Sequence, residues 1–272
     1  MKLDKKPIRE SYTFVGWFED EELTKQVETV KMNKDRTVYA KWEKSETPDE
    51  FRDDHVAYII GYPDGTVGPN RSITRAEVAT IFYRLLKDEV RAQYQTDSSP
   101  FSDVSAENWY NTEVSTMANM GILNGYPDGT FGPDRQITRA EFAAIAARFG
   151  SEPFDGEVPF NDIDEHWAKN EICRAASRGW IIGYEDGSFK PDQSITRAEA
   201  VTLINRVLNR VPKSVDALLP DMATFPDNQN TEAWYYLPIQ EATNSHTYHM
   251  DEITVSEVWD ELIANIDWSS LG

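Results

Sequence analysis

Apolar side chains recur along the chain with the spacing of an amphipathic helix. Within Thr74–Leu86, five apolar residues follow the order i, i+3, i+4, i+7, i+8, which predicts a helix with one face in the core. Further helices are predicted over Asn111–Met120, Ile137–Phe149, Lys169–Arg178, Ile195–Leu208 and a stretch that ends near Asn244.

The N-terminal part follows a different period. Tyr12–Phe18 and Thr37–Trp42 alternate between apolar and polar residues, which predicts two β-strands. Two such strands are marginally stable alone. The segment Ser45–Asp49, which contains Pro48, is expected to link them to the remainder of the chain.

One pentapeptide, Ile-Thr-Arg-Ala-Glu, opens a predicted helix three times, at Ile73–Glu77, Ile137–Glu141 and Ile195–Glu199. In each copy the arginine stands 14 residues after the first glycine of a Gly-Tyr-x-Asp-Gly turn. These turns are Gly61–Gly65, Gly125–Gly129 and Gly183–Gly187. The fixed distance shows that turn and helix form one repeated unit.

Helix initiation explains four of the five letters. Thr138 and Glu141 form the pattern of a capping box, Ile137 and Phe142 that of a hydrophobic staple, and alanine favours a helix. The arginine is different, because a cation in the first turn opposes the helix dipole by about 0.3–1 kcal/mol.

Two explanations for Arg75, Arg139 and Arg197 remain open. Free amides at the helix N-terminus and a guanidinium fork would together bind a carboxylate or phosphate of a ligand. Alternatively, the arginines bridge to a nearby acid such as Asp128 and clamp the structure. Under the first explanation, Arg139→Ala is expected to weaken ligand binding without cost to the helix.

The motifs divide the chain into five parts. These are a β fragment (residues 1–44), an abbreviated repeat with only turn and capped helix (45–88), two complete repeats (89–150 and 151–212), and a C-terminal half repeat (213–272) with an amphipathic tail, Glu252–Ile266, expected to cap a surface. Because repeat arrays need neighbours to cover their apolar faces, we expect the half repeat to complete the first repeat, cover the helix Thr74–Leu86 and close a three-fold ring.

The first half of the repeat has its own motif, a Phe-x-Asp triplet followed by a tryptophan. The pairs are Asp103 with Trp109, Asp162 with Trp167, and Asp227 with Trp234. In the complete repeats a glycine, Gly121 or Gly179, stands 12 residues after the tryptophan. His246 takes this position in the half repeat.

Acidic residues outnumber basic ones by 47 to 27, which leaves a net charge of −20. A field of this sign repels nucleic acid and anionic membranes, although a local cationic site can still bind an anionic sugar. No stretch approaches the roughly 18 apolar residues of a spanning helix, so no membrane insertion is expected. The N-terminus lacks the apolar core of a signal peptide, so a secreted protein of this sequence is expected to be a mature or truncated piece.

The repeated motifs supply the candidate ligand-binding residues. The tryptophans either stack on sugar rings or belong to the core, and the Phe-x-Asp aspartates either cap the turn before the tryptophan or accept from sugar hydroxyls. The Asp-Gly turns lack the alternating acids of a calcium loop, so their aspartates are expected to accept from their own backbone, and their glycines to supply positive φ or let a sugar approach. The candidates are Arg75, Arg139, Arg197, Gly61, Asp64, Gly65, Gly125, Asp128, Gly129, Gly183, Asp186, Gly187, Trp109, Trp167, Trp234, Asp103, Asp162 and Asp227.

The sequence shows no constellation typical of an enzyme. Its four histidines, His55, His166, His246 and His249, have no zinc-like spacing with acids on a helix, so no metal or cofactor is expected. Cys173 lies in a predicted helix and is expected to be buried rather than catalytic. Paired carboxylates stay open as an alternative, but a motif repeated three times favours multivalent binding over one asymmetric active site.

These motifs resemble S-layer homology repeats over roughly Phe51 to Leu208, with the half repeat beyond. Phe-x-Asp, Trp-Tyr or Trp-Ala, Gly-Tyr-x-Asp-Gly and Ile-Thr-Arg-Ala-Glu occur in the order and spacing of that family. The chain departs from it at Glu185 in the third turn, at Val67 after the first, and at His246.

The resemblance implies a mainly α, pseudo-three-fold bundle of helix-loop-helix repeats with short strands and turns. It also implies an extracellular anchor that binds secondary cell-wall polysaccharide, with a pyruvylated amino sugar in grooves between repeats and its carboxylate on the motif arginine. A cargo domain upstream in a larger surface protein is expected. The alternative is a self-assembling surface-layer protein whose arginines only clamp neighbouring repeats.

The N-terminal fragment resembles the C-terminal half of the internalin-type B repeat, a small β-grasp module of bacterial surface proteins. The segments that carry this resemblance are Tyr12–Phe18 and Thr37–Trp42. Because the first half of that module is missing, residues 1–44 are expected to be a truncated copy.

Overall fold

A computed structural model describes residues 2–3, 6–31, 35–150, 160–210, 212–251 and 256–268. These residues form two compact units. The first comprises Met1–Glu46 and Arg139–Gln193, and the second comprises Thr47–Thr138 and Ser194–Gly272. The predicted repeat boundary at residue 151 and the start of the predicted tail, residues 252–255, lie outside the described residues.

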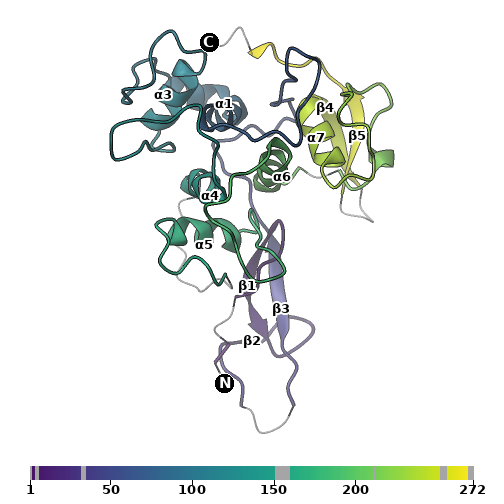
Figure 1. Ribbon diagram of the computed structural model, residues 1–272. Coiled ribbons are helices and arrows are strands. Elements are labelled where there is room, and N and C mark those ends of the chain that lie inside the picture. Colours follow the sequence, from purple (N-terminus) through teal and green to yellow (C-terminus); the bar gives the residue numbers. More distant parts are fainter. Residues whose placement is uncertain are drawn as a thin grey trace. The chain divides into compact units, whose positions relative to one another are not determined.

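The first compact unit combines the predicted β fragment with two helices (Figure 1). Its elements are β1 (Tyr12–Phe18), β2 (Gln26–Val27), β3 (Tyr39–Lys44), α4 (Arg139–Arg148) and α5 (Lys169–Ser177). The strands form an antiparallel sheet in the order β2-β1-β3, which confirms the two predicted strands and adds β2. The helices α4 and α5 pack together, and Cys173 in α5 is buried as predicted.

The sheet joins α5 at the end of that helix. Gly179 has a φ of +66°, and its carbonyl accepts from the Ser11 amide at 3.1 Å. The Ser45 hydroxyl donates to the Arg178 carbonyl at 2.6 Å. A small sheet of this kind is marginally stable alone, and hydrogen bonds to the end of α5 stabilise it here.

The second compact unit holds most of the helices. Its elements are α1 (Arg75–Leu85), α2 (Asp88–Tyr94), α3 (Asn111–Asn119), α6 (Arg197–Val207), a 3-10 turn (Val215–Ala217), α7 (Tyr236–Thr243), β4 (His246–Asp251) and β5 (Ser256–Leu262). The predicted helices are confirmed to within two residues at each end. The short helix α2 was not predicted, because its seven mainly polar residues are too few to show a clear apolar period.

The motif helices begin as the sequence predicts. In α1 the Glu77 amide donates to the Thr74 hydroxyl at 3.2 Å, and the Thr74 amide donates to the Glu77 carboxylate at 2.8 Å. Thr196 and Glu199 form the same capping box at α6. The Thr-x-x-Glu letters therefore act in helix initiation.

The residue before each cap links three repeats in a cycle within the second compact unit. The amide of Ile73 donates to the carbonyl of Ile195 at 3.3 Å, that of Ile137 to Ile73 at 3.1 Å, and that of Ile195 to Ile137 at 3.1 Å. All three side chains are fully buried. Each repeat therefore contributes one donor and one acceptor to a closed set of main-chain bonds.

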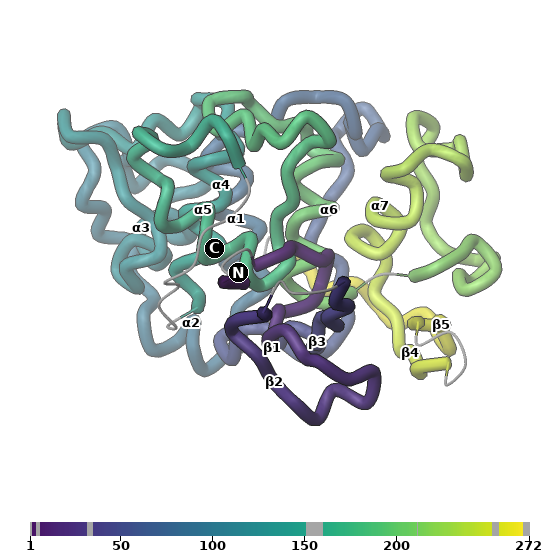
Figure 2. Tube along the Cα trace, turned by 90° about the horizontal axis from the view of Figure 1, so that it is seen from below, coloured from purple at the N-terminus to yellow at the C-terminus, as the bar shows by residue number. Residues whose placement is uncertain are grey.

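The prediction that the half repeat covers the first motif helix is wrong. Helix α1 packs against α3, whereas α7 of the C-terminal half repeat packs against α6; Figure 2 shows α6 and α7 side by side. The reason is that the first helix of a repeat packs on the motif helix that precedes it in sequence, as α3 does on α1 and α5 on α4. By the same rule α7 packs on α6 and not on α1.

The half repeat reaches the first repeat through loops instead. The amides of Tyr58 and Ile59 both donate to the carbonyl of Ala242 at the end of α7, each at 3.0 Å. In the complete second repeat, the amides of Ile122 and Leu123 make the same pair of bonds to the Met117 carbonyl in α3. Two segments far apart in sequence thus reproduce a connection that is local elsewhere.

Two strands near the C-terminus form a β-hairpin, and only the second of them, β5, lies in the predicted tail. Strands β4 and β5 are antiparallel, and Trp259 of β5 packs in a small core with Leu218 and Tyr236. This hairpin and the N-terminal sheet make the described part of the chain mixed α and β, where the sequence predicted mainly α. Within that part, no helix combines the length and apolar character needed to cross a membrane.

Candidate functional site

The motif arginines are buried and hold backbone carbonyls. Arg139 donates through Nε to the Phe189 carbonyl at 2.7 Å and through a terminal nitrogen to the Ile182 carbonyl at 3.0 Å. Arg75 makes the equivalent bonds to Phe131 at 2.8 Å and Asn124 at 2.9 Å. Each guanidinium thus fixes both ends of the Gly-Tyr-x-Asp-Gly turn that follows in sequence.

The amides at the start of the motif helices are not free to bind a ligand. In α4 the amides of Arg139 and Ala140 donate to the carbonyls of Gln193 and Pro191, both at 2.9 Å. The equivalent amides of α1 and α6 donate to Arg135 and Pro133, and to Arg71 and Pro69. The predicted receptor of open helix amides is therefore wrong, because loop carbonyls already occupy the first two donors.

Each turn carries a tyrosine whose ring contacts two cations. The Tyr126 ring centroid lies 4.8 Å from the Arg75 guanidinium and 4.3 Å from that of Arg135. The other two triplets are Tyr184 with Arg139 and Lys190, and Tyr62 with Arg197 and Arg71. In each case the second cation is exposed while the motif arginine is buried.

The sequence motifs did not identify the exposed cations. Arg71 and Arg135 each stand four residues before the motif arginine, and this spacing could have identified them. Lys190 stands seven residues before Arg197, so the same rule fails in the third repeat. Their shared feature, the face of the turn tyrosine, exists only in the folded chain.

The three motif tryptophans lie on the surface. Trp109 and Trp167 are each 63% exposed, and Trp234 is 60% exposed. Of the two sequence interpretations, membership of the core is therefore wrong. Trp109 contacts the Tyr110 ring edge-on, with centroids 5.2 Å apart, and Trp234 contacts Tyr235 in the same way. An exposed indole held by a neighbouring ring can bind the apolar face of a sugar.

The Phe-x-Asp aspartates have a role that neither sequence interpretation included. The two carboxylate oxygens of Asp103 accept from the amides of Phe131 and Gly132 at 2.7 and 2.8 Å. Asp162 binds Phe189 and Lys190 in the same way, and Asp227 binds Val67 and Gly68. These carboxylates therefore anchor the end of the glycine turn, which in the second and third turns is the part of the loop that Arg75 and Arg139 also hold.

The turn residues act locally. Asp128 accepts from the amide and hydroxyl of Thr130 at 3.0 and 2.7 Å, and Gly129 has a φ of +83°. The other two turns repeat this, with Asp64 and Thr66 before and after Gly65, and Asp186 and Ser188 around Gly187. The Thr66 hydroxyl and amide, with Arg71, lower the pKa of Asp64 to about 2.

The first glycine of each turn is required by packing. A Cβ on Gly125 would lie 2.6 Å from the Phe101 ring and 2.5 Å from the Thr130 carbonyl oxygen. Gly61 and Gly183 approach Phe225 and Phe160 in the same way. The structure thus explains these glycines by contact with the Phe-x-Asp phenylalanine, whereas the sequence related them to a sugar.

The site around Arg197 differs from the other two. Its terminal nitrogens contact the Ile60 carbonyl at 2.8 Å and the Glu77 carboxylate at 3.3 Å. Its buried Nε has no hydrogen-bond partner among the described residues. Arg75 and Arg139 each lie over the ring of a phenylalanine that stands two residues after the glycine turn, Phe131 and Phe189. In the first repeat this position holds Val67. The departure noted in the sequence therefore changes the environment of one arginine.

Comparison with known proteins agrees with this geometry. Residues 58–79, 100–143 and 159–201 match the S-layer homology domain. These segments are S-layer homology repeats. They contain the glycine turns and motif arginines described above. Residues 1–41 match the Listeria-Bacteroides repeat domain, which supports a repeat module at the N-terminus and does not identify it as an internalin-type β-grasp module.

Similar proteins include cell surface glycoprotein 1 of Acetivibrio thermocellus, which is 37% identical over 221 residues, 76% of this chain and 9% of the relative. The cellulosome-anchoring protein of the same organism is 36% identical over 205 residues, 73% of this chain and 44% of the relative. An S-layer protein of Bacillus licheniformis is 31% identical over 180 residues, 64% of this chain and 20% of the relative. The chain spans less than half of each of these proteins.

Proposed function

We propose that this chain is a non-covalent cell-wall anchor whose S-layer homology repeats bind a secondary cell-wall polysaccharide. The observation that carries the proposal is the repetition, three times, of an exposed tryptophan and of a tyrosine whose ring contacts two cations. In a chain of net charge −20, these are local cationic sites retained against the overall charge. Three copies would bind a polymer with avidity that no single copy provides.

The proposed ligand is an anionic sugar of the pyruvylated amino-sugar type. Trp109 or its equivalents would stack on the sugar ring, and Arg135, Arg71 or Lys190 would pair with the carboxylate. The buried motif arginines would contribute by holding the turn in place and by adding positive charge beneath its tyrosine. The site at Arg197 would be the weakest, because Glu77 already pairs with this arginine.

The proposed location is the outer surface of a bacterial cell wall, and the proposed context is a larger surface protein with a cargo domain. The names of the relatives, a cell surface glycoprotein and a cellulosome-anchoring protein, support both points. We also infer a three-fold order of the repeats, with residues 225–245 completing the first. The cyclic bonds of the three motif isoleucines support this inference.

A second candidate is a self-assembling surface-layer protein whose arginines only clamp neighbouring repeats. The observation in its favour is that Arg75 and Arg139 are buried and bind carbonyls of the protein. The exposed tryptophans favour the anchor, because a purely structural repeat gains nothing from three indoles in water.

Sedimentation with purified cell wall, with and without chemical removal of the polysaccharide, tests the proposal. The anchor predicts binding that is lost with the polysaccharide. Trp109→Ala and Arg135→Ala are expected to weaken binding by about 1 kcal/mol each, roughly fivefold, whereas Lys213→Ala, which removes an exposed cation elsewhere, should have no effect. Equal binding to stripped wall would support self-assembly instead.

A further inference from the structure

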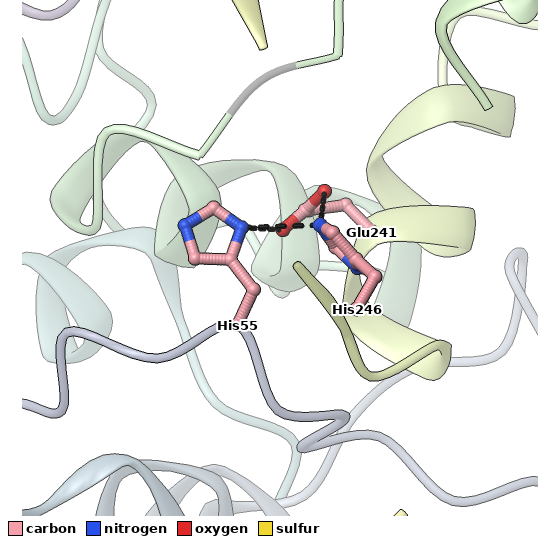
Figure 3. Close-up of side chains that lie close together, drawn as sticks. All are labelled: His55, Glu241 and His246. Carbon is pink, nitrogen blue, oxygen red and sulfur yellow. Dashed lines mark hydrogen bonds and ion pairs between the residues drawn. The ribbon is translucent and has the colours of Figure 1, made fainter. Parts of the chain in front are cut away.

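Three buried side chains outside the repeated sites converge in the second compact unit. His55 precedes the first glycine turn, Glu241 lies in the last turn of α7, and His246 is the first residue of β4 (Figure 3). The two histidines are 191 residues apart in sequence. All three residues are at most 5% exposed.

His246, which takes the position of the glycine in the complete repeats, is held beside His55 by a backbone hydrogen bond. The His246 amide donates to the His55 carbonyl at 3.0 Å, so the backbone sets the two side chains side by side. The half repeat differs from the complete repeats at the point where it meets the start of the first repeat. No part of the proposed polysaccharide site uses these three residues.

The distances between their donor atoms fit one metal ion. His55 Nδ1 lies 3.0 Å from Glu241 Oε1 and 3.2 Å from His246 Nε2, and His246 Nε2 lies 3.4 Å from Glu241 Oε2. A tetrahedral zinc ion with bonds of about 2.0–2.1 Å separates its ligand atoms by roughly 3.3 Å. Two imidazoles and one carboxylate are also a donor set that zinc prefers.

Surrounding groups orient the donors toward this point. His246 Nδ1 lies 2.9 Å from the Asn244 carbonyl, which can only accept, so Nδ1 carries the proton and Nε2 presents a lone pair to the cluster. The Trp259 indole nitrogen donates to Glu241 Oε2 at 3.2 Å. Tyr248 stacks on the His55 ring at 4.1 Å between centroids, and Trp259 stacks on His246 at 4.0 Å.

A hydrogen-bonded network without metal satisfies these groups less well. A single proton on His55 Nδ1 would face both Glu241 and the lone pair of His246. If that proton goes to the buried Glu241 Oε1, 3.0 Å from His55 Nδ1, no donor among the described residues is left for His246 Nε2. The buried Arg210 donates to the carbonyls of Arg52 and Asp54 and adds positive charge near Glu241. Among the described residues it donates no hydrogen bond to Glu241. A cation between the three donors satisfies all of them at once.

We propose that His55, Glu241 and His246 bind one divalent transition-metal ion, with zinc as the best match. The ion would tie the beginning of the first repeat to the C-terminal half repeat and act as a structural clamp. A fourth ligand, such as water, would complete its coordination.

The test uses the full chain, purified without a histidine tag and stripped with a chelator. Titration with Zn²⁺ alone is expected to bind one ion per chain and raise the melting temperature. Co²⁺ should give the visible absorption of a tetrahedral site. His246→Gln and Glu241→Gln, which keep side-chain size, should lose stoichiometric binding and the thermal shift. His249→Gln is the matched control, because His249 is exposed and pairs with Asp260 outside the cluster.

X-ray absorption of the zinc-loaded wild-type protein gives a readout that does not depend on the folding of variants. Two imidazoles and at least one carboxylate oxygen are expected around the ion. Absence of stoichiometric uptake by the wild-type protein, a different ligand set, or unchanged binding in folded His246→Gln and Glu241→Gln would overturn the proposal. Wall binding is not part of this test, so its outcome is independent of the proposed anchor function.

Discussion

At the scale of single residues, the motif side chains act mainly on backbone. Arg139 binds two carbonyls of the following turn, Asp103 binds two amides of its own repeat's turn, and Asp128 closes the turn on Thr130. A side chain in the repeated motif thus shapes the loop that carries an exposed cation or aromatic ring. The arginine at the first helical position is explained by these bonds, which outweigh an unfavourable dipole interaction of about 0.3–1 kcal/mol.

Replacing Arg139 by alanine is therefore expected to destabilise the protein. The sequence alone predicted no effect on stability, but the change removes two charge-assisted hydrogen bonds and leaves the carbonyls of Phe189 and Ile182 without this donor. We expect a loss of about 2–4 kcal/mol in the free energy of unfolding, measured by urea denaturation. Arg139→Lys should recover only part of it, because a single ammonium cannot reproduce the fork.

The control is Arg135→Ala, which removes an exposed guanidinium that lies over the face of Tyr126. It should change stability by less than about 1 kcal/mol. Equal denaturation midpoints for wild type and Arg139→Ala would show that the buried bonds do not contribute to stability, and the clamp would have to be rejected.

At the scale of elements, each repeat packs its glycine turn on its Phe-x-Asp triplet. Phe101 and Phe131 stack with centroids 5.3 Å apart, and Gly125 lies against the Phe101 ring. Phe160 and Phe189 form the equivalent pair in the next repeat, 5.2 Å apart. Contact between two halves of a repeat, far apart in sequence, thus determines the shape of the turn.

Gly125→Ala is expected to break this contact. The new Cβ would meet both the Phe101 ring and a backbone oxygen, and the oxygen cannot move without distorting the turn. We expect a destabilisation of about 1–3 kcal/mol, with a lower melting temperature. Ala at Gly129 is the comparison, because nothing lies within 4 Å there and only the cost of its positive φ, about 1–2 kcal/mol, remains. A Gly125→Ala variant that melts like wild type would contradict the packing argument.

At the scale of the whole molecule, the C-terminal half repeat serves two neighbours. Its helix α7 covers α6, and the Ala242 carbonyl at the end of α7 and the Asp227 carboxylate in the loop before it accept from amides of residues 58–68 of the first repeat. Helix α1, by contrast, has α3 as its packing partner. Loss of the half repeat should therefore destabilise α6 and residues 58–68 and leave α1 protected.

Deletion from Asp221 onward tests this arrangement by hydrogen exchange. Faster exchange is expected in α6 and in residues 58–68, while α1 stays protected by α3. If the half repeat covered Thr74–Leu86, as the repeat pattern predicts, the order for α1 and α6 would be reversed. Loss of protection in α1 with α6 unchanged would show that the half repeat covers α1 and would contradict the packing of α7 on α6.

The sequence by itself determined the local parts of this protein. Helix starts, capping boxes, Asp-Gly turns and the N-terminal strands depend on residues within a few positions of one another, so periodicity and spacing predicted them. Contacts between distant residues were decided only by the tertiary structure. They include the carbonyls held by Arg139, the two cations that contact the Tyr126 ring, and the cluster of His55 and Glu241 with His246. Helix α2 and the C-terminal hairpin were missed for the same physical reason, because their polar or mixed sequences become ordered through packing partners that lie elsewhere in the chain.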